Sequence, residues 1–315
     1  MNETSPYQTL RSARSQTVTI RNQQYHLNVW GEPHTTQPPL LMVHGWMDVG
    51  ASFQFVVDAL QAADGFERLI IAPDWRGFGL TQTPAADCYW FPDYVGDLDA
   101  LVDAVSPLAP LDLLGHSMGG NVVMSYAGVR PQRLRKLINL EGFGLPRADA
   151  QEAPPRLVKW LDELKEPQDM RPYDSVSGVA ERLLKNNPRL GADKAAWLAT
   201  RWARQGADGR WHILGDAGHK RVNPMIYRAD EILETWKLIS APLLWVEGDS
   251  TDTGRWWGQR YSKAEFHQRL NLVPQAQREV LKDCGHMLHH DQPEALAALL
   301  AGRTPEGYLS ARPAT

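Results

Sequence analysis

The alternation of short apolar runs with helical patterns is the feature that most constrains the fold of this chain. Strands that alternate with helices are joined by crossover connections, which produce a mostly parallel sheet. Six apolar runs occur, at PLLMVHG (39–45), RLIIAPD (68–74), LDLLGHS (111–117), RLRKLINLE (133–141), APLLWVEGD (241–249) and REVLKD (278–283). Residues 17–31 alternate polar and apolar positions around a polar stretch, which predicts an antiparallel hairpin. The sequence therefore predicts an α/β fold with a mostly parallel central sheet of about eight strands and flanking helices.

One long segment interrupts this alternation. Residues 146–239 contain helical patterns and no comparable buried strands, and five tryptophans stand among their charged residues. We expect a helical cap insertion there, with the core of the fold in 1–145 and 240–302. Tryptophans at helical spacing more often pack than bind ligands, so the cap is a candidate for specificity only. The polar, Gly- and Pro-containing residues 303–315 are expected to form a flexible tail.

Charge and composition exclude several functional classes. The 33 basic and 37 acidic residues give a net charge of −4, so no basic surface for nucleic acid is expected. The N-terminal residues lack the apolar stretch of a signal peptide, and no apolar run reaches the ~18 residues of a membrane span. We therefore expect a cytoplasmic protein. Cys88 and Cys284 are too few for a disulfide framework, and Cys284 is expected to be inert packing. The oligomeric state is left open.

The strongest chemical signal is a glycine-flanked serine between a predicted strand and a predicted helix. Gly115, Ser117 and Gly119 form the pattern G-x-S-x-G. A sharp turn there needs glycines where backbone segments approach closely, and it lifts the Ser117 hydroxyl clear of the sheet. The Met118 N–H lies at the start of the helix, where unpaired donors and the helix dipole favour a developing negative charge. Ser117 is thus the candidate nucleophile, and Met118 the candidate for one half of an oxyanion hole.

Two further segments follow strand ends and complete this set. In Val43-His44-Gly45-Trp46 the Trp46 N–H is the candidate for the second oxyanion donor, whereas His44 is expected to hold the loop shape. His286 follows the last strand and a glycine, in the chain order Ser, acid, His, and is therefore the candidate base.

Two other histidines lie nearby in the sequence. His289 and His290 are expected to be solvated or to cap a helix. No metal site is expected, because adjacent side chains diverge and no further ligand cluster accompanies them.

Four sequence blocks resemble the hallmark blocks of the α/β-hydrolase superfamily, in the same order and over residues 17 to 302. They are MVHGWMDVGASF (42–53), APDWRGFGLT (72–81), LLGHSMGGNV (113–122) and DCGHMLHHDQPEALA (283–297). Within the superfamily, the HGWMD block resembles the serine hydrolase-like group. The resemblance implies an α/β-hydrolase fold with a helical cap inserted after the sixth strand. It also implies a Ser–His–acid hydrolase that needs no cofactor.

Three carboxylates compete for the acid position. In the family the acid usually follows the seventh strand as G-x-x-D, but Thr251 occupies that place here. Asp252 lies one residue later, resembles a G-x-x-[ST]-D variant and is the preferred candidate. Asp249 lies two residues earlier, and Glu141 lies at the end of the sixth strand, where haloalkane dehalogenases resembling this stretch carry their acid. All three follow the serine and precede the histidine, so chain order does not decide among them.

This combination predicts a hydrolase that cleaves small-molecule carboxylic esters with small to medium acyl groups through an acyl-enzyme. Lactones and thioesters are within reach of the same chemistry, and a Trp-rich cap favours apolar acyl groups. Ser117 argues against haloalkane dehalogenase and epoxide hydrolase activity, since the relatives with those activities carry Asp as the nucleophile. Three alternatives stay open: a cofactor-free haloperoxidase, a carbon–carbon bond hydrolase on the same triad, and a non-catalytic ligand-binding protein of this fold.

Overall fold

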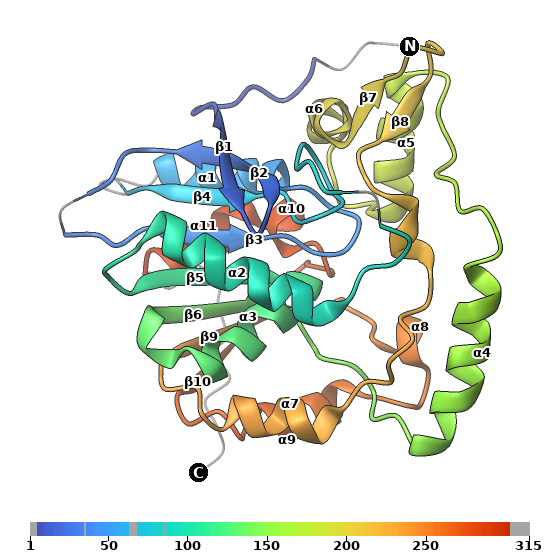
Figure 1. Cartoon of the computed structure of the whole chain (residues 1–315). Coiled ribbons are helices and arrows are strands. Elements are labelled where there is room, and N and C mark those ends of the chain that lie inside the picture. Colours follow the sequence, from blue (N-terminus) through green and yellow to red (C-terminus); the bar gives the residue numbers. More distant parts are fainter. Residues whose placement is uncertain (1–4, 35, 63–67, 85, 303–315) are drawn as a thin grey trace.

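A single eight-stranded sheet forms the centre of the computed structural model, which describes residues 5–34, 36–62, 68–84 and 86–302 (Figure 1). Its spatial order is β1-β2-β4-β3-β5-β6-β9-β10. The strands are β1 (Arg14–Ile20), β2 (Gln23–Trp30), β3 (Leu40–Val43), β4 (Ile70–Pro73), β5 (Leu111–His116), β6 (Leu134–Leu140), β9 (Leu243–Gly248) and β10 (Ala276–Leu281). β1 and β2 form an antiparallel hairpin, β2 also pairs antiparallel with β4, and the other neighbours are parallel. The predicted α/β class and strand number are confirmed.

Helices cover both faces of the sheet, which explains why the strands appear as apolar runs rather than alternating patterns. Successive strand residues face opposite sides, so Leu41 and Val43 join the apolar core on one face while Leu40 and Met42 join the core on the other. The first face carries α2 (Phe91–Val105), α3 (Met118–Val129), α7 (Ala229–Trp236) and α9 (Lys263–Leu270). The second face carries α1 (Gln54–Ala62), α10 (Leu288–Asp291) and α11 (Pro293–Leu300).

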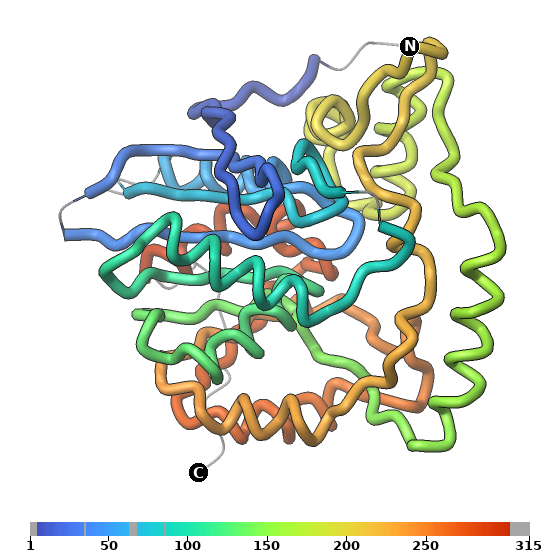
Figure 2. The backbone as a smooth tube through the Cα atoms, in the orientation of Figure 1, coloured from blue at the N-terminus to red at the C-terminus, as the bar shows by residue number. Residues whose placement is uncertain are grey.

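The chain between β6 and α7 lies beside the sheet and outside both helical layers (Figure 2). It contains α4 (Ala153–Glu163), α5 (Val176–Asn186), α6 (Ala192–Trp202) and the short hairpin β7 (Ala203–Gln205) and β8 (Trp211–Ile213). α5 and α6 pack together in a separate apolar cluster that includes Phe55 of the core. Sequence analysis did not predict β7 and β8, because strands of three residues are too short to show an alternating pattern.

The last helix of the predicted cap, α7, packs against α3 of the core. A side-chain carbon added at Gly128 of α3 would lie 2.0 Å from the Thr235 carbonyl oxygen of α7, so glycine is what allows this close approach. A cap drawn to residue 239 thus includes one helix that belongs to the layer on the sheet. The predicted tail 303–315 lies outside the described residues. Among the described helices, none combines the length and apolarity that crossing a membrane requires.

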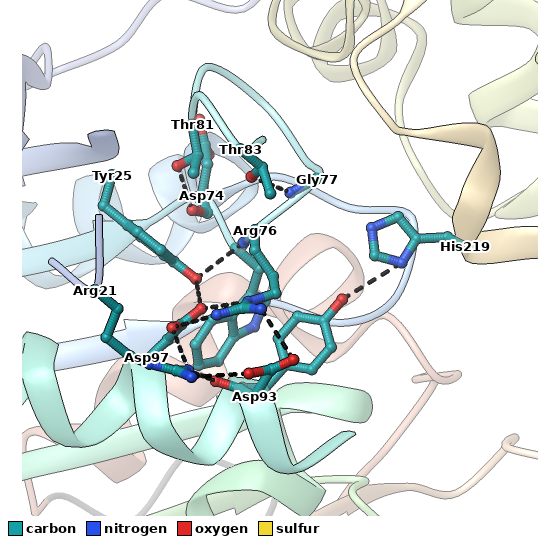
Figure 3. Close-up of polar contacts among 12 residues, drawn as sticks. Arg21, Tyr25, Asp74, Arg76, Gly77, Thr81, Thr83, Asp93, Asp97 and His219 are labelled. Atoms are coloured by element: carbon teal, nitrogen blue, oxygen red, sulfur yellow. Dashed lines mark hydrogen bonds and ion pairs between the residues drawn. The ribbon is translucent and has the colours of Figure 1, made fainter. Parts of the chain in front are cut away.

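An ion-pair network anchored on α2 fixes the loop that follows β4 (Figure 3). The buried Asp97 carboxylate accepts hydrogen bonds from Arg76 Nε at 2.6 Å, from Arg21 Nη1 at 2.9 Å and from the Tyr25 hydroxyl. Arg76 also lies 3.1 Å from Asp93. Because Arg21 and Tyr25 belong to the β1–β2 hairpin, the network ties that hairpin and the β4 loop to one helix, and it keeps the loop in place beside the cavity described below.

Candidate active site

Ser117 occupies a strained turn between β5 and α3. Its backbone has φ 52° and ψ −115°, a conformation that costs a non-glycine residue about 1–3 kcal/mol. The flanking glycines are sterically required: a side-chain carbon at Gly115 would lie 2.4 Å from the Gly119 carbonyl oxygen, and one at Gly119 would lie 2.5 Å from the Val43 carbonyl oxygen. The sharp turn predicted from G-x-S-x-G is present, and it directs the Ser117 side chain into a cavity.

Ser117, His286 and Glu141 form a continuous hydrogen-bonded relay. His286 Nε2 lies 2.9 Å from Ser117 Oγ, and His286 Nδ1 lies 2.7 Å from Glu141 Oε2. The other carboxylate oxygen of Glu141 accepts the backbone N–H of Gly248 at 2.7 Å, and the glutamate is almost fully buried. An ionised carboxylate only accepts hydrogen bonds, so His286 Nδ1 carries the proton. Nε2 then presents its lone pair to the serine hydroxyl, as a general base requires.

The preferred acid, Asp252, does not reach His286. Its side chain is exposed and accepts the backbone N–H of Gly254 at 2.9 Å, at the start of α8 (Gly254–Trp257). Asp249 instead accepts two backbone N–H groups of the loop that precedes His286. The physical reason is the direction of the chain after β9, which leads to α8, whereas Glu141 directly follows β6 and its carboxylate bridges the Gly248 N–H and His286. The preference for Asp252 is therefore corrected to Glu141.

Both candidate oxyanion donors lie next to Ser117. α3 begins at Met118, so the N–H of this residue has no partner within the helix. The loop that carries Trp46 touches the serine from the other side, because a side-chain carbon at Gly45 would lie 3.0 Å from Ser117 Cβ. Trp46, Ser117 and Met118 line the same cavity. Their arrangement suits two N–H groups that stabilise negative charge on an oxygen bound to Ser117, which stays a prediction.

The cavity above the relay has a volume of about 860 Å³, within the usual size range of small-molecule sites. Its floor is the edge of the sheet where parallel strands end, and residues of the segment between β6 and α7 form the opposite wall. Most of the lining is aromatic or apolar and includes Trp46, Trp90, Phe91, Phe143, Trp236 and Trp257. Trp256 also packs edge-on against the His286 ring, with centroids 4.6 Å apart. The site is therefore a mostly apolar chamber, with one polar group at the relay and a second on the opposite wall, where Arg156, Arg221, Asn223, Arg228 and Glu231 line it.

Sequence analysis missed one histidine of the cavity. His219 stacks between the rings of Phe78 and Tyr89, with centroid distances of 3.9 and 3.6 Å. Burial lowers its pKa to about 4, so the ring is neutral at pH 7. No sequence signal distinguishes this residue, because its neighbours in space come from segments more than a hundred residues earlier. The neutral, stacked ring extends the aromatic wall.

Three other histidines were considered from the sequence. His44 is fully buried, and its Nε2 accepts the Trp75 backbone N–H at 2.9 Å, which agrees with the expected structural role. His289 and His290 were expected to be solvated or capping, and this is wrong: both are buried on α10. The reason is tertiary, because α10 packs under Phe53 and Phe55, with His–Phe centroid distances of 5.0 and 5.7 Å.

Comparisons with known proteins agree with this fold. A family model described as alpha/beta hydrolase fold matches residues 38–293. A serine hydrolase-like protein of Danio rerio is 26% identical over 284 residues, which are 86% of this chain and 82% of the relative. The cis-3-alkyl-4-alkyloxetan-2-one decarboxylase of Shewanella oneidensis is 28% identical over 270 residues, 80% of this chain and 77% of the relative. Among solved structures, a thioesterase domain from the curacin biosynthetic pathway superposes with a TM-score of 0.79 at 26% identity, covering 92% of this chain and 99% of that domain.

Proposed function

The chain belongs to the alpha/beta hydrolase family, and from this premise we propose that it hydrolyses carboxylic esters through Ser117, His286 and Glu141. The observation that carries the proposal is the unbroken relay from the buried Glu141 carboxylate through the His286 ring to the Ser117 hydroxyl. The three residues of the relay line the mostly apolar cavity, so a substrate in the cavity can reach Ser117. A buried carboxylate, an oriented imidazole and an exposed hydroxyl are the parts that acyl transfer to serine requires.

Each step of the proposed reaction uses a group already in place. Ser117 Oγ attacks the acyl carbon while His286 Nε2 takes the hydroxyl proton, and the carbonyl electron pair moves onto oxygen. The N–H groups of Trp46 and Met118 stabilise that oxyanion. The intermediate then expels the alcohol or thiol, which takes its proton from His286. Water repeats the sequence on the acyl-enzyme and releases the acid. Glu141 stays ionised throughout and stabilises the imidazolium.

The cavity supports esters with small to medium apolar acyl groups. Aromatic side chains surround Ser117, and the volume of about 860 Å³ leaves room for a medium-length acyl chain and a leaving group. The similarity to a thioesterase domain, which aligns almost end to end, supports including thioesters in the substrate class. A thioester differs from an ester only in the leaving atom, so the same relay serves both.

The test is hydrolysis of a series of aryl esters from acetate to dodecanoate by the full-length chain. We expect measurable turnover for the shorter members and its loss in Ser117→Ala, with Glu141→Gln, Asp252→Asn and Asp249→Asn assayed in parallel. A fluorophosphonate probe should label Ser117 in native but not in heat-denatured protein. Absence of turnover on every ester together with absence of labelling would contradict the proposal and favour a binding protein. Labelling without ester turnover would favour carbon–carbon hydrolysis or haloperoxidase chemistry.

A further inference from the structure

A second group of buried, chemically reactive side chains lies outside the cavity. Asp48 follows β3, and His289 and His290 lie on α10, some 240 positions further along the chain. One ligand atom from each of the three lies within 4.8 Å of the other two. The three residues are 3%, 0% and 3% exposed, and none of them lines the cavity above Ser117. We call them the Asp48–His289–His290 cluster.

Four side-chain polar atoms of this cluster lack hydrogen-bond partners among the described residues. Asp48 Oδ2, both ring nitrogens of His289 and Nε2 of His290 are all buried and unbonded. His289 Nε2 and Asp48 Oδ2 lie 3.5 Å apart, which is within ion-pair distance but beyond the ~2.7–2.9 Å of a charge-assisted hydrogen bond. Buried polar atoms without a hydrogen-bond partner are rare in folded proteins, and each one needs a specific explanation, such as a bound ion.

Hydrogen bonds to one oxygen of the Asp48 carboxylate fix its orientation, as is usual for carboxylates that bind metal ions. Asp48 Oδ1 accepts the Val49 backbone N–H at 2.8 Å, the Trp202 indole N–H at 3.0 Å and the Ser52 hydroxyl. Three donors on one oxygen fix the rotamer and leave Oδ2 directed at the histidines. Hydrogen bonds of this kind orient the ligands of metal sites and are as much a part of them as the ligands themselves.

We propose that Asp48, His289 and His290 bind a divalent transition-metal ion of the zinc class. Two imidazole nitrogens and one carboxylate oxygen form a ligand set that suits Zn²⁺ and its first-row neighbours, whereas Ca²⁺ and Mg²⁺ prefer oxygen ligands throughout. One atom of each residue coordinates the ion, which accounts for three of the four unbonded atoms and leaves one ring nitrogen of His289. The ion also balances the buried carboxylate. Three protein ligands leave a further position for water. The sequence argument against a metal was that adjacent side chains diverge and that no further ligand cluster accompanies them. In the structure the centroids of the two histidine rings lie 4.3 Å apart, and the third ligand comes from a distant loop.

The position of this ion gives it a structural role beside the proposed active site. Asp48 lies two residues after Trp46, and His289 lies three residues after His286. The ion therefore joins the loop of the candidate oxyanion donor to the segment that carries the candidate base. His116 reinforces this link, because its Nε2 donates to the His286 carbonyl oxygen at 2.8 Å while its ring packs on His289 at 4.5 Å.

Metal content and titration of the untagged, full-length protein test this proposal. After dialysis against a chelator, isothermal titration with Zn²⁺ should give one equivalent per chain, and Zn²⁺ should raise the melting temperature. Replacing Zn²⁺ with Co²⁺ should give visible absorption bands from nitrogen and oxygen coordination. His290→Phe keeps a ring beside Phe55 and should abolish binding. His212→Phe is the matched control, because His212 also faces a carboxylate, Asp208, but lies exposed outside the cluster.

The outcomes separate the possibilities. Wild-type protein that takes up neither Zn²⁺ nor Co²⁺ would overturn the proposal and leave water or a shared proton as the occupant of the cluster. Equal binding by wild type and a folded His290→Phe protein would also overturn it. If His290→Phe fails to fold, the Co²⁺ spectrum and the metal-dependent melting temperature of the wild type decide the question alone. None of these readouts depends on ester turnover, so the proposal stands or falls separately from the proposed function.

Discussion

Replacing Glu141 by glutamine should stop turnover by reversing the proton positions on His286. The carboxylate accepts two hydrogen bonds at 2.7 Å, one from the Gly248 N–H and one from His286 Nδ1. A glutamine side chain has only one oxygen, and the backbone N–H of Gly248 can only donate, so the oxygen faces Gly248 and accepts that hydrogen bond. The NH₂ group then faces His286 Nδ1, which must give up its proton to accept a hydrogen bond.

The size of the effect follows from that tautomer. With Nδ1 unprotonated, Nε2 carries the proton and points it at Ser117, so it cannot take the proton of the serine hydroxyl. The developing imidazolium also loses its buried negative partner. A triad histidine held in the wrong tautomer loses about 10⁴-fold in kcat in serine proteases, and we expect about 10³- to 10⁴-fold here, or about 4–5 kcal/mol of transition-state stabilisation.

Steady-state kinetics on the best aryl ester measure this effect. We expect kcat to fall in Glu141→Gln with KM little changed, because the glutamine keeps the shape of the cavity floor. Asp252→Asn is the matched control and should stay within about twofold of wild type, since its carboxylate is exposed and accepts the Gly254 N–H rather than a hydrogen bond from His286. A Glu141→Gln enzyme with more than a tenth of the wild-type kcat, or a larger loss in Asp252→Asn, would refute the reasoning.

Three further predictions concern the scaffold. Asp97→Ala removes the partner of the mostly buried Arg76 guanidinium and should lower the free energy of unfolding in urea by about 3–5 kcal/mol. Asp103→Ala, at an exposed ion pair, should cost under about 1 kcal/mol. Gly128→Ala places a methyl group 2.0 Å from the Thr235 oxygen and should lower the melting temperature by several degrees in calorimetry. His219 has a folded pKa of about 4 against 6.5 unfolded, so the unfolded chain binds more protons between those values, and stability falls as pH drops through that window. His219→Phe keeps the ring stack but cannot be protonated. Between pH 7 and pH 4 its free energy of unfolding, measured from urea midpoints, should therefore fall by up to about 3 kcal/mol less than that of the wild type.

The sheet and the serine turn could be predicted because their signals are local. A strand buried on both faces is a short apolar run whatever its neighbours, and six of the eight strands of the central sheet were recognisable in this way. The hairpin of β1 and β2 was recognised instead by its alternation of polar and apolar residues. The turn at Ser117 brings backbone segments so close together that only glycine fits at positions 115 and 119, and this requirement is visible in the sequence. The hairpin β7–β8 carried no such signal, because its strands are three residues long and only partly buried.

The acid and the buried histidines could not be predicted, because both depend on where distant segments meet. Glu141, Asp249 and Asp252 all follow strands that end at one edge of the sheet, so all three are near the site by topology alone. The choice among them depends on the path of the chain after β9, which no spacing rule fixes. His289 and His290 likewise lie on a helix of four residues, and their burial is set by aromatic residues more than two hundred positions earlier.

Backbone strain links the members of the relay. Ser117 and Glu141 have φ values of 52° and 54°, and Asp283, just before the His286 loop, has φ 51°. Each such residue costs about 1–3 kcal/mol and persists only where the surroundings hold it. The Ser117 and Glu141 N–H groups donate to carbonyl oxygens of adjacent strands at 2.8 and 3.2 Å, and the Asp283 N–H donates to Asp249 at 3.1 Å. Asp249 therefore stabilises the turn that precedes His286, while Glu141 contacts the His286 ring itself. Two carboxylates that were candidates for the same position in the sequence thus have different roles in one site.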